Sequence, residues 1–493
     1  MLRSWVRPIL IVGTLILALA LARPAAHLMR VAWKDRNDIE KVPAGFVDDV
    51  SRMNQAKVSA VWEAPGDERS AEESLRRLLE TARKNGLQVS IAGARHSMGG
   101  QTIFPGGIAV DMSGLRAMRL DPGKTILHVQ AGARWADVIP YLDAQGRSIG
   151  VMQSDNNFSV GGSLSVNCHG WQYDRPPISS TVESFRLMKA DGTVVGCSRT
   201  ENSELFSLAL GGYGLFGIIL DADLRVVPNQ RLRLEQQLVP LDDALKSFDR
   251  QVREKPGVSM VYARLDITPQ NLFRQVIINL FYPEARGEIP SLAEPEFLKF
   301  RRAMFRGSVD SDYGKDLRWR AETKLQPRLA GKIFSRNQLL NESADWFLDH
   351  SSQTTDILHE YFIPRAGAMD FLADLKRIIP ARRADLLNVT VRQINEDKDT
   401  FLRYADRPVI AFVMFFNMKR TPEADTKMES MTGEIIEAAI QRGGRYYLPY
   451  RLHATRDQFH RAYPQASRFF ELKRKYDPNE LFQNQFYVKY GRR

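Results

Sequence analysis

The sequence predicts an α+β protein, because helical and strand patterns alternate in its first half and longer apolar strands occur in its second half. Residues 70–85 repeat apolar side chains at the period of a helix and have acidic residues in the first turn. Apolar runs typical of strands lie at residues 89–92, 108–111, 126–130, 258–265, 272–281, 387–395 and 409–418. The four later runs predict an antiparallel sheet flanked by helices.

The size and charge of the chain narrow the classes of protein it can belong to. With 493 residues it is expected to form two or more domains, and its net charge of +11 favours anionic partners such as a membrane surface or a phosphorylated ligand. No zinc-finger spacing or single basic helix accompanies this charge, so we expect no nucleic-acid binding. Cys168 and Cys197 form no CxxC pair, which predicts no metal site and leaves one disulfide open in an oxidising compartment.

The N-terminus carries an uncharged apolar run at residues 8–22, preceded by Arg3 and Arg7. As a helix this run spans about 22 Å, which fits a signal peptide cleaved near residues 20–22 better than the roughly 30 Å core of a bilayer. A second apolar stretch at residues 24–33 makes a retained membrane helix feasible if the neighbouring arginines extend to the surface. We therefore expect residues 1–46 to be a membrane anchor and linker. The alternative is a secreted or periplasmic protein.

The orientation of this anchor follows from the basic residues on either side of the run. Two basic residues precede it, whereas a larger group follows it, namely Arg23, Arg30, Lys34, Arg36 and Lys41. Because basic residues favour the cytoplasmic side, the main body is expected to face the cytoplasm.

A glycine-rich loop after the strand at 89–92 carries the first candidate functional group. The loop begins at Gly93, presents His96, and ends in paired glycines at 99 and 100. Glycines allow positive φ and a close approach of the backbone to a ligand. His96 is therefore either a ligand, base or nucleophile, or an exposed histidine in an ordinary turn.

Residues 155–170 form a second unusual segment, with glycines at 161, 162 and 170 separated by small hydroxyl residues. This segment is longer than most connections, which have about four to six residues. Its composition suits a backbone laid against a flat or phosphorylated ligand.

A third glycine-rich segment contains Gly212, Gly214 and Gly217, which match the pattern GxGxxG. That dinucleotide-binding motif requires a preceding strand and a following helix. Here a helical pattern precedes it, at residues 203–210, and a strand pattern follows, at 218–227. The segment is therefore not a nicotinamide-binding motif.

Together these segments resemble the FAD-binding domain of the vanillyl-alcohol-oxidase (PCMH-type) flavoproteins. Within that family they are most similar to cytokinin dehydrogenases and to alditol and sugar-lactone oxidases. His96-Ser97 followed by Gln101 is similar to the H-S-x-x-G-Q of cytokinin dehydrogenases. Further segments similar to that family begin at Pro105, Ser159, Glu201, Tyr447 and Lys475. The resemblance covers residues 47–230 well and 440–490 moderately.

The resemblance implies an FAD oxidoreductase and assigns roles to individual residues. His96 holds the position of the histidine that bonds covalently to the 8α-methyl of the flavin. Gly93, Ser97 and Gln101 are expected along the pyrophosphate and isoalloxazine, and Ser159, Gly161, Gly162, Ser165 and His169 are expected to continue that cradle. Ile218 and Ile219 are expected near the adenine, and Tyr447 and Gln485 over the ring.

The resemblance also divides the chain. Residues 47–230 are the expected FAD-binding domain, 231–440 the substrate domain, and 441–493 a segment that returns to the FAD-binding domain. Within the substrate domain, residues 296–348 look helical and strongly basic. This insert is either a solvated helical face or a surface resting on a membrane.

Catalysis in this family is hydride transfer from a substrate C–H to flavin N5, and here the sequence departs from both groups of relatives. Ser154 stands where cytokinin dehydrogenases carry an aspartate, and Asp155, one residue later, is either a base or an Asx-turn residue. Arg392 matches an arginine that faces the substrate in alditol and lactone oxidases, but Thr390 replaces their glutamate. Their C-terminal His-Trp-Gly-Lys run is absent, with His453 nearby. We expect Arg392, Asp155 and His453 to be catalytic, with neither a cytokinin nor a simple polyol as substrate.

The leading hypothesis is therefore an FAD-dependent oxidase or dehydrogenase acting on an alcohol, lactone or amine, either a small molecule or one linked to lipid. The electron acceptor is expected to be O2 or a quinone. Two alternatives stay open, a flavin-dependent reductase of a lipid or sterol double bond and a non-enzymatic flavin-binding membrane protein.

Overall fold

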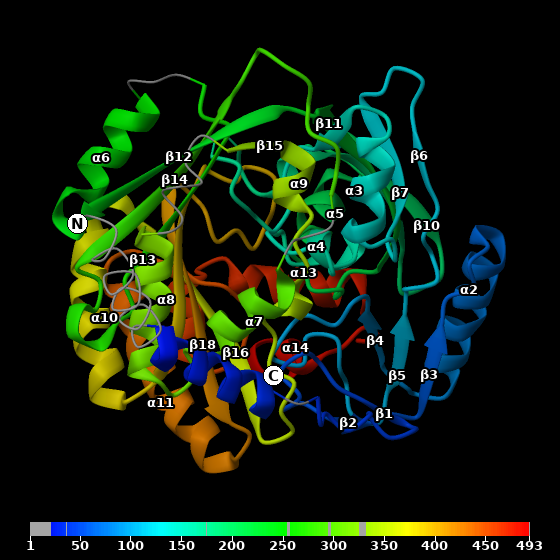
Figure 1. Ribbon diagram of the computed structural model, residues 1–493. Helices are drawn as coiled ribbons and strands as arrows, with labels where there is room; N and C mark the ends of the chain where they lie inside the picture. The colour runs from blue at the N-terminus through cyan, green and yellow to red at the C-terminus, as the bar shows by residue number, and fades with distance from the viewer. Residues whose placement is uncertain are drawn as a thin grey trace, which may run out of the picture.

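The computed structural model describes residues 21–35, 37–173, 175–253, 257–293, 297–324 and 332–492. Helices and sheets are mixed, and the sheets are mainly antiparallel, which confirms the predicted α+β class. Figure 1 shows residues 46–228, which we call the N-terminal half, on the right of the view and the large sheet of the middle residues on the left. The C-terminal helices lie between them.

The first layer is a small parallel sheet in the order β3-β5-β4. Helix α2 contributes the buried Leu75 and Leu79 to the core shared with this sheet, as the helical period of apolar residues predicts. Asp67 caps the helix by accepting a hydrogen bond from the Ser70 amide. The elements of this part are β1 (Phe46–Val47), β2 (Ala56–Lys57), β3 (Ala60–Glu63), α2 (Glu68–Lys84), β4 (Val89–Ala92) and β5 (Ile108–Asp111).

The second layer is an antiparallel sheet in the order β10-β9-β11-β7-β6, with β8 paired to β11. Its elements are β6 (Met118–Leu120), β7 (Ile126–Gln130), α3 (Trp135–Asp143), β8 (Arg147–Ile149), α4 (Val160–Ser165), β9 (Val182–Met188), β10 (Val194–Ser198), α5 (Ser203–Ala209) and β11 (Ile218–Pro228). Gly212, Gly214 and Gly217 lie between helix α5 and strand β11, as the rejection of a dinucleotide motif requires.

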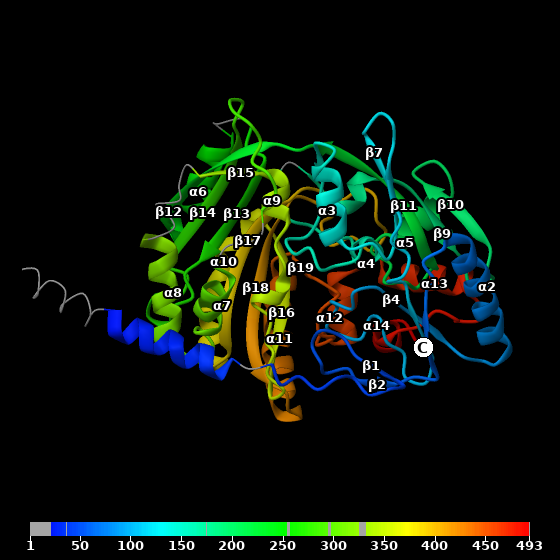
Figure 2. The same ribbon diagram turned by 45° about the vertical axis from the view of Figure 1, so that its right-hand side comes forward.

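The middle of the chain forms a sheet whose order in the described residues is β15-β12-β14-β13-β17-β18-β16-β19. Helices α6, α10 and α11 cover one face, and the other face looks toward the N-terminal half (Figure 2). This is the expected antiparallel sheet flanked by helices. Its elements are β12 (Arg231–Pro240), α6 (Leu241–Arg253), β13 (Met260–Leu265), β14 (Gln275–Pro283), β16 (Thr354–Pro364), α10 (Ala368–Arg382), β17 (Asp385–Ile394), β18 (Val409–Lys419), α11 (Pro422–Gln441) and β19 (Arg445–Tyr446).

The basic insert at 296–348 is less helical than predicted. Residues 325–331 lie outside the described residues, and the rest forms α7 (Leu298–Arg306), α8 (Asp312–Lys324), β15 (Ile333–Ser335) and α9 (Arg336–Leu340). Several of its arginines are buried in ion pairs, so it is not simply a solvated face. Arg306 pairs with Asp356 at 2.8 Å and Arg318 with Glu322 at 2.9 Å.

The C-terminal helices pack against the N-terminal half. Their bounds are α12 (Arg456–Ala462), α13 (Ala466–Tyr476) and α14 (Gln485–Tyr490). Phe482 forms a parallel bridge with Val89 of β4, and Asp477 accepts hydrogen bonds from the Leu481 and Phe482 amides. The carboxylate of Asp477 is also paired with Lys473, and both side chains are fully buried. This buried pair fixes the strand that returns to β4.

The anchor prediction rests on the apolar run at residues 8–22, of which residues 8–20 lie outside the described residues, while residues 21–34 are helical. Among the residues that the structure describes, no helix is long and apolar enough to cross a membrane. Cys168 and Cys197 are both buried and free.

Candidate functional site

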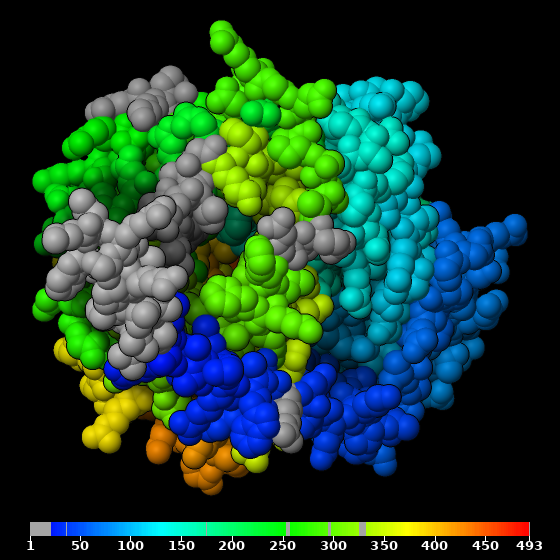
Figure 3. Space-filling model, in the orientation of Figure 1, coloured from blue at the N-terminus to red at the C-terminus, as the bar shows by residue number. Residues whose placement is uncertain are grey.

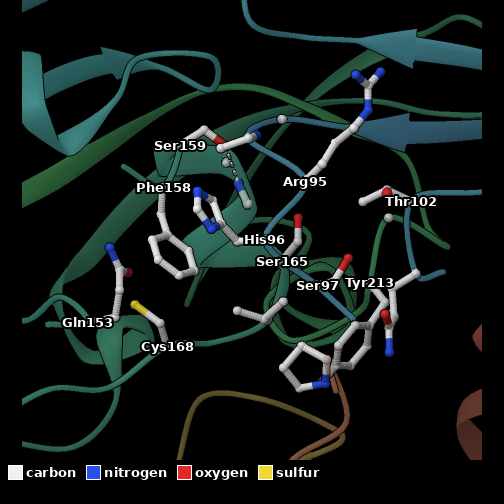
Figure 4. Close-up of a pocket in the computed structure, with 18 of the residues that line it drawn as sticks. Arg95, His96, Ser97, Thr102, Gln153, Phe158, Ser159, Ser165, Cys168 and Tyr213 are labelled. Carbon is white, nitrogen blue, oxygen red and sulfur yellow. Dashed lines mark hydrogen bonds between the residues drawn. The ribbon is translucent and has the colours of Figure 1, made fainter. Parts of the chain in front are cut away.

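A cavity lies between the N-terminal half and one face of the large sheet. Its empty volume is about 1350 Å³, part of it open to solvent, which is the size of a site for a large ligand. The loop after β4, the segment around α4 and the start of β11 line one side, and β16, β17 and β18 line the other. Figure 4 shows the side formed by the loop and α4.

The loop after β4 holds His96 inside this cavity. Arg95 has a φ of +56°, and its guanidinium pairs with Asp111 at 3.1 Å, so an ion pair to the end of β5 holds the turn in place. The imidazole of His96 stacks on the ring of Phe158, with 4.1 Å between the ring centroids (Figure 4). Burial lowers the pKa of His96 to about 4, so the imidazole is neutral and nucleophilic at neutral pH.

Helix α4 places backbone against the same space. Ser159 caps the helix by accepting hydrogen bonds from the Gly162 amide and from the Ala94 amide of the loop. A Cβ atom on Gly93 would lie 2.1 Å from the Ser159 hydroxyl, so only glycine allows the loop to approach the helix this closely. Gly161 and Gly162 add two more positions without side chains to the cavity wall.

The polar groups of this wall fit the FAD that the resemblance implies. The hydroxyls of Ser97 and Thr102 are buried and find no hydrogen-bond partner among the described residues. Buried polar groups are nearly always paired in folded proteins, so these two hydroxyls indicate a ligand with polar atoms. A long cavity with glycine backbone and unpaired hydroxyls suits a cofactor with a flat ring and phosphates.

A buried histidine of the α4 side meets a buried glutamate of the opposite wall, because His169 follows α4 and Glu360 lies on β16. His169 Nε2 lies 2.6 Å from Glu360 Oε1, and the two side chains are 4% and 2% exposed. The contact is an ion pair by distance, and Glu360 Oε1 has no hydrogen-bond partner among the described residues. The negative charge of the carboxylate favours a proton on the nearer ring nitrogen, Nε2. Nδ1 of His169 has no partner among the described residues and so remains an acceptor. A base oriented by a carboxylate is the arrangement that enzymes use to take up a proton.

Arg392 joins this pair to the segment around α4. Its Nη2 donates to the Ser154 hydroxyl at 2.7 Å and its Nη1 to the His169 carbonyl at 3.4 Å. Its Nε is buried without a partner in the described part of the chain. The guanidinium therefore keeps a donor for a ligand oxygen.

Asp155 lies in the cavity wall beside Arg392. Burial raises its pKa to about 7, while the guanidinium of Arg392 acts in the opposite direction. The carboxyl therefore changes its protonation state near neutral pH.

Most of the sequence-predicted site residues line this cavity. They are Gly93, His96, Ser97, Gln101, Asp155, Ser159, Gly161, Gly162, Ser165, His169, Ile219, Arg392 and Tyr447. The side-chain amide of Gln101 is hydrogen-bonded within the protein, because Nε2 donates to the carbonyls of Leu448 and Tyr450. Gln101 therefore ties the loop to the C-terminal segment.

The structure places Gln485, Ile218 and His453 away from the cavity wall. The side chain of Gln485 packs behind the loop at Gly100. Neighbouring residues of a strand point to opposite faces, so Ile219 faces the cavity and Ile218 is buried in the core. His453 is buried between Thr432 and Asp425, with Nδ1 3.1 Å from the threonine hydroxyl.

Sequence reasoning missed Glu360, Phe158 and Thr102. Glu360 lies on β16, a strand that was not among the predicted ones. Glu360 could have been found from the sequence, because it is a charged residue inside the apolar run at 357–363. A charge in such a run usually belongs to a functional site or to a buried ion pair. In the sheet, both Glu360 and Thr390 pair with Val413, so the carboxylate lies in the same cross-strand row as the threonine, two strands away.

Two family models match the chain. The first, described as an FAD binding domain, matches residues 69–198. The second, described as D-arabinono-1,4-lactone oxidase, matches residues 319–490. The first includes the loop and α4, and the second includes Glu360 and Arg392, so both walls of the cavity fall inside matched regions.

Curated relatives agree with the models. L-gulonolactone oxidase of Mus musculus is 24% identical over 84% of this chain and 92% of its own length. Cytokinin dehydrogenase 4 of Oryza sativa subsp. japonica is 33% identical over 34% of this chain and 33% of its own. D-arabinono-1,4-lactone oxidase of Debaryomyces hansenii is 28% identical over 36% of this chain and 34% of its own. The names are those of oxidases and dehydrogenases, which argues against a non-enzymatic flavin-binding protein.

Proposed function

Because the chain belongs to the FAD-linked oxidoreductases that carry a PCMH-type FAD-binding domain, we propose that its cavity oxidises a hydroxyl-bearing carbon of a small sugar lactone or related alcohol. The observation that carries this proposal is the pair of His169 and Glu360 beside Arg392, in which Nδ1 of His169 has no hydrogen-bond partner among the described residues. His169 thus supplies a proton acceptor and Arg392 a positive charge, and the oxidation of a hydroxyl group uses both.

In this proposal each side chain has one task. Arg392 binds the substrate oxygen through its free Nε and stabilises the charge that develops on that oxygen. His169 takes the hydroxyl proton on Nδ1, and Glu360 keeps the imidazole oriented and stabilises its charged form. Bound FAD supplies the acceptor for the hydride that leaves the same carbon. The alcohol thus loses one hydride and one proton and becomes a carbonyl.

Asp155 was among the residues expected to be catalytic, and we assign proton uptake to His169 instead. The imidazole has a free nitrogen and a carboxylate that orients it, whereas Asp155 has no such partner beyond the charge of Arg392. Asp155, when ionised, instead offsets part of the positive charge of Arg392 that the substrate would otherwise bind.

Anaerobic mixing of the flavin-loaded full chain with candidate substrates tests the reaction. A sugar lactone or a related alcohol is expected to bleach the visible absorbance of the flavin, whereas an amine, a lipid double-bond substrate or NAD(P)H is not. If NAD(P)H alone bleaches it, the protein is a reductase. If no lactone or alcohol does so, the proposal is wrong. Mixing the reduced protein with O2 and with a quinone decides between the two proposed electron acceptors.

We also propose that His96 forms the covalent bond to FAD. Its neutral imidazole, held against Phe158, is the nucleophilic form that such a bond requires. After denaturation, flavin fluorescence is expected to stay with the wild-type polypeptide and to be released from His96→Ala. His128→Ala, which removes a histidine of β7 paired with Asp223, is the control and is expected to keep it. Retention of flavin by His96→Ala would exclude the bond.

A further inference from the structure

The helical residues 21–34 dock onto the large sheet domain with one face. His27 Nε2 lies 3.0 Å from the carbonyl of Gly307 at the end of α7, and its ring packs edge-on against Tyr313 of α8. Arg23 lies over the same Tyr313 ring at 4.1 Å. At the other end, Asp35 accepts a hydrogen bond of 2.7 Å from Arg302. The helix therefore runs antiparallel to α7, with its C-terminal end toward the start of α7.

The opposite face of this helix is apolar and exposed. Its members recur at helical spacing and are Ala22, Ala25, Ala26, Met29 and Trp33. Trp33 is 69% exposed and Met29 is 66% exposed. Helices on the surface of a globular protein normally turn their polar face outward. Here the arrangement is reversed, which marks an interaction surface.

The start of α7, next to the C-terminal end of this helix, also exposes apolar side chains. Phe297 is 76% exposed and Phe300 is 53% exposed, and Leu298 beside them is also exposed. Figure 2 shows the N-terminal helix (blue) beside α7 and α8, and Figure 3 shows it and α7 on one face, next to a hollow between α7 and α9. We use the name docking surface for the exposed apolar side chains of these two neighbouring segments, namely Ala22, Ala25, Ala26, Met29, Trp33, Phe297, Leu298 and Phe300.

Charge and sequence indicate what covers the docking surface. Exposed basic side chains border it, namely Arg23, Arg30, Lys34 and Lys299. In the sequence, the helix at residues 21–34 is directly preceded by the uncharged apolar run that starts at residue 8. Apolar and aromatic residues flanked by lysine and arginine are the composition of helices that lie in the membrane interface.

We propose that the docking surface lies on an anionic lipid bilayer, with Met29, Trp33, Phe297 and Phe300 among the acyl chains near the headgroups. The basic side chains around it contact anionic headgroups. This proposal does not depend on which substrate the cavity oxidises.

The docking surface is also coupled to the cavity by direct contacts. Arg301 of α7 pairs with Glu342 at 2.9 Å and lies over the Trp346 ring at 4.5 Å. The carbonyl of Glu342 accepts a hydrogen bond from the amide of Asn156, next to Asp155 in the cavity wall. A protein lying on lipid through this surface therefore holds one edge of its active site close to the membrane.

Site-directed spin labelling of the full chain tests the proposal, because it reports on each position separately. Met29→Cys and Phe300→Cys place a nitroxide in the docking surface, and Leu238→Cys places one on β12 at a side chain that is 45% exposed. The native cysteines are buried and stay unlabelled. Accessibility to oxygen, which partitions into lipid, is compared with accessibility to a water-soluble nickel chelate.

With vesicles that contain phosphatidylglycerol, the oxygen-to-nickel accessibility ratio is expected to rise severalfold at positions 29 and 300 and to stay unchanged at 238. With pure phosphatidylcholine, the rise is expected to be much smaller. If the vesicles bind the protein but the labels at 29 and 300 do not respond, the contact is made by the residues before 21 and the proposal is wrong. An equal response at position 238 or an equal response to both lipids also contradicts it.

Discussion

Glu360→Gln is the substitution that most sharply separates the proposed chemistry from simple packing. The glutamine keeps the size of the side chain but removes the negative charge that lies 2.6 Å from His169 Nε2. Because an amide both donates and accepts, it no longer dictates that the proton stays on Nε2. His169 then loses the free acceptor at Nδ1 in part of the population, and its charged form loses its stabilising partner.

The expected loss follows from the role of such a pair. Positioned proton acceptors contribute about 100- to 10,000-fold, and replacing an orienting carboxylate by its amide has an effect near the upper end of that range. The rate of flavin reduction by substrate is therefore expected to fall by about 100- to 10,000-fold, or about 3 to 5 kcal/mol in the activation free energy. The dependence of that rate on pH is expected to change shape as well, since the group that takes up the proton is altered.

Anaerobic stopped-flow reduction of the flavin, measured over a range of pH, is the assay. Asp356→Asn is the matched control, because Asp356 is a buried carboxylate on the same strand that is paired with Arg306 and does not line the cavity. The control is expected to lower the melting temperature while leaving the reduction rate of the folded protein unchanged. If Glu360→Gln reduces flavin within about threefold of wild type, the proposed role of the pair is refuted.

Two further changes test other parts of the account. Burial raises the pKa of Asp155 to about 7, so its ionised form appears above neutral pH and competes with the substrate for Arg392. The KM of wild type is expected to rise above pH 7, and Asp155→Asn is expected to abolish that rise. A folded-state pKa above the ordinary value means that stability is lost as pH rises through 7, so Asp155→Asn is also expected to raise the melting temperature more at pH 8 than at pH 5. Asp477→Ala leaves the buried ammonium of Lys473 unpaired and is expected to lower the free energy of unfolding by about 3 to 5 kcal/mol in denaturant titrations. Asp457→Ala, which removes an exposed partner of Arg461, is expected to cost less than about 1 kcal/mol.

The cofactor side of the cavity could be predicted from the sequence because its signals are local. The loop around His96 and the helix that begins at Val160 carry glycines and small hydroxyls in short continuous stretches, where backbone conformation alone restricts the residue types. These stretches line the cavity together with most of the residues assigned from them.

The substrate side depends on strand register, which is not a local property. Glu360 and Thr390 are thirty positions apart in the chain, yet each pairs with Val413 on the strand between them. The departure at Thr390 therefore looked like the loss of a carboxylate, although β16, two strands away, supplies one to the same face. His453 shows the opposite error, because a turn after Tyr450 buries it against Thr432 and away from the cavity.

The central claim is that this cavity holds the flavin, and flavin content of cavity variants tests it most directly. Gly162→Leu adds a side chain at a point where a Cβ meets only the Ser159 hydroxyl and then open cavity, whereas Gly433→Leu adds the same side chain to α11, where a Cβ meets nothing within 4 Å. Wild type and Gly433→Leu are expected to purify with an equimolar amount of flavin, and Gly162→Leu is expected to lose it while remaining folded by circular dichroism. Full flavin content in Gly162→Leu, or none in wild type, would contradict the account.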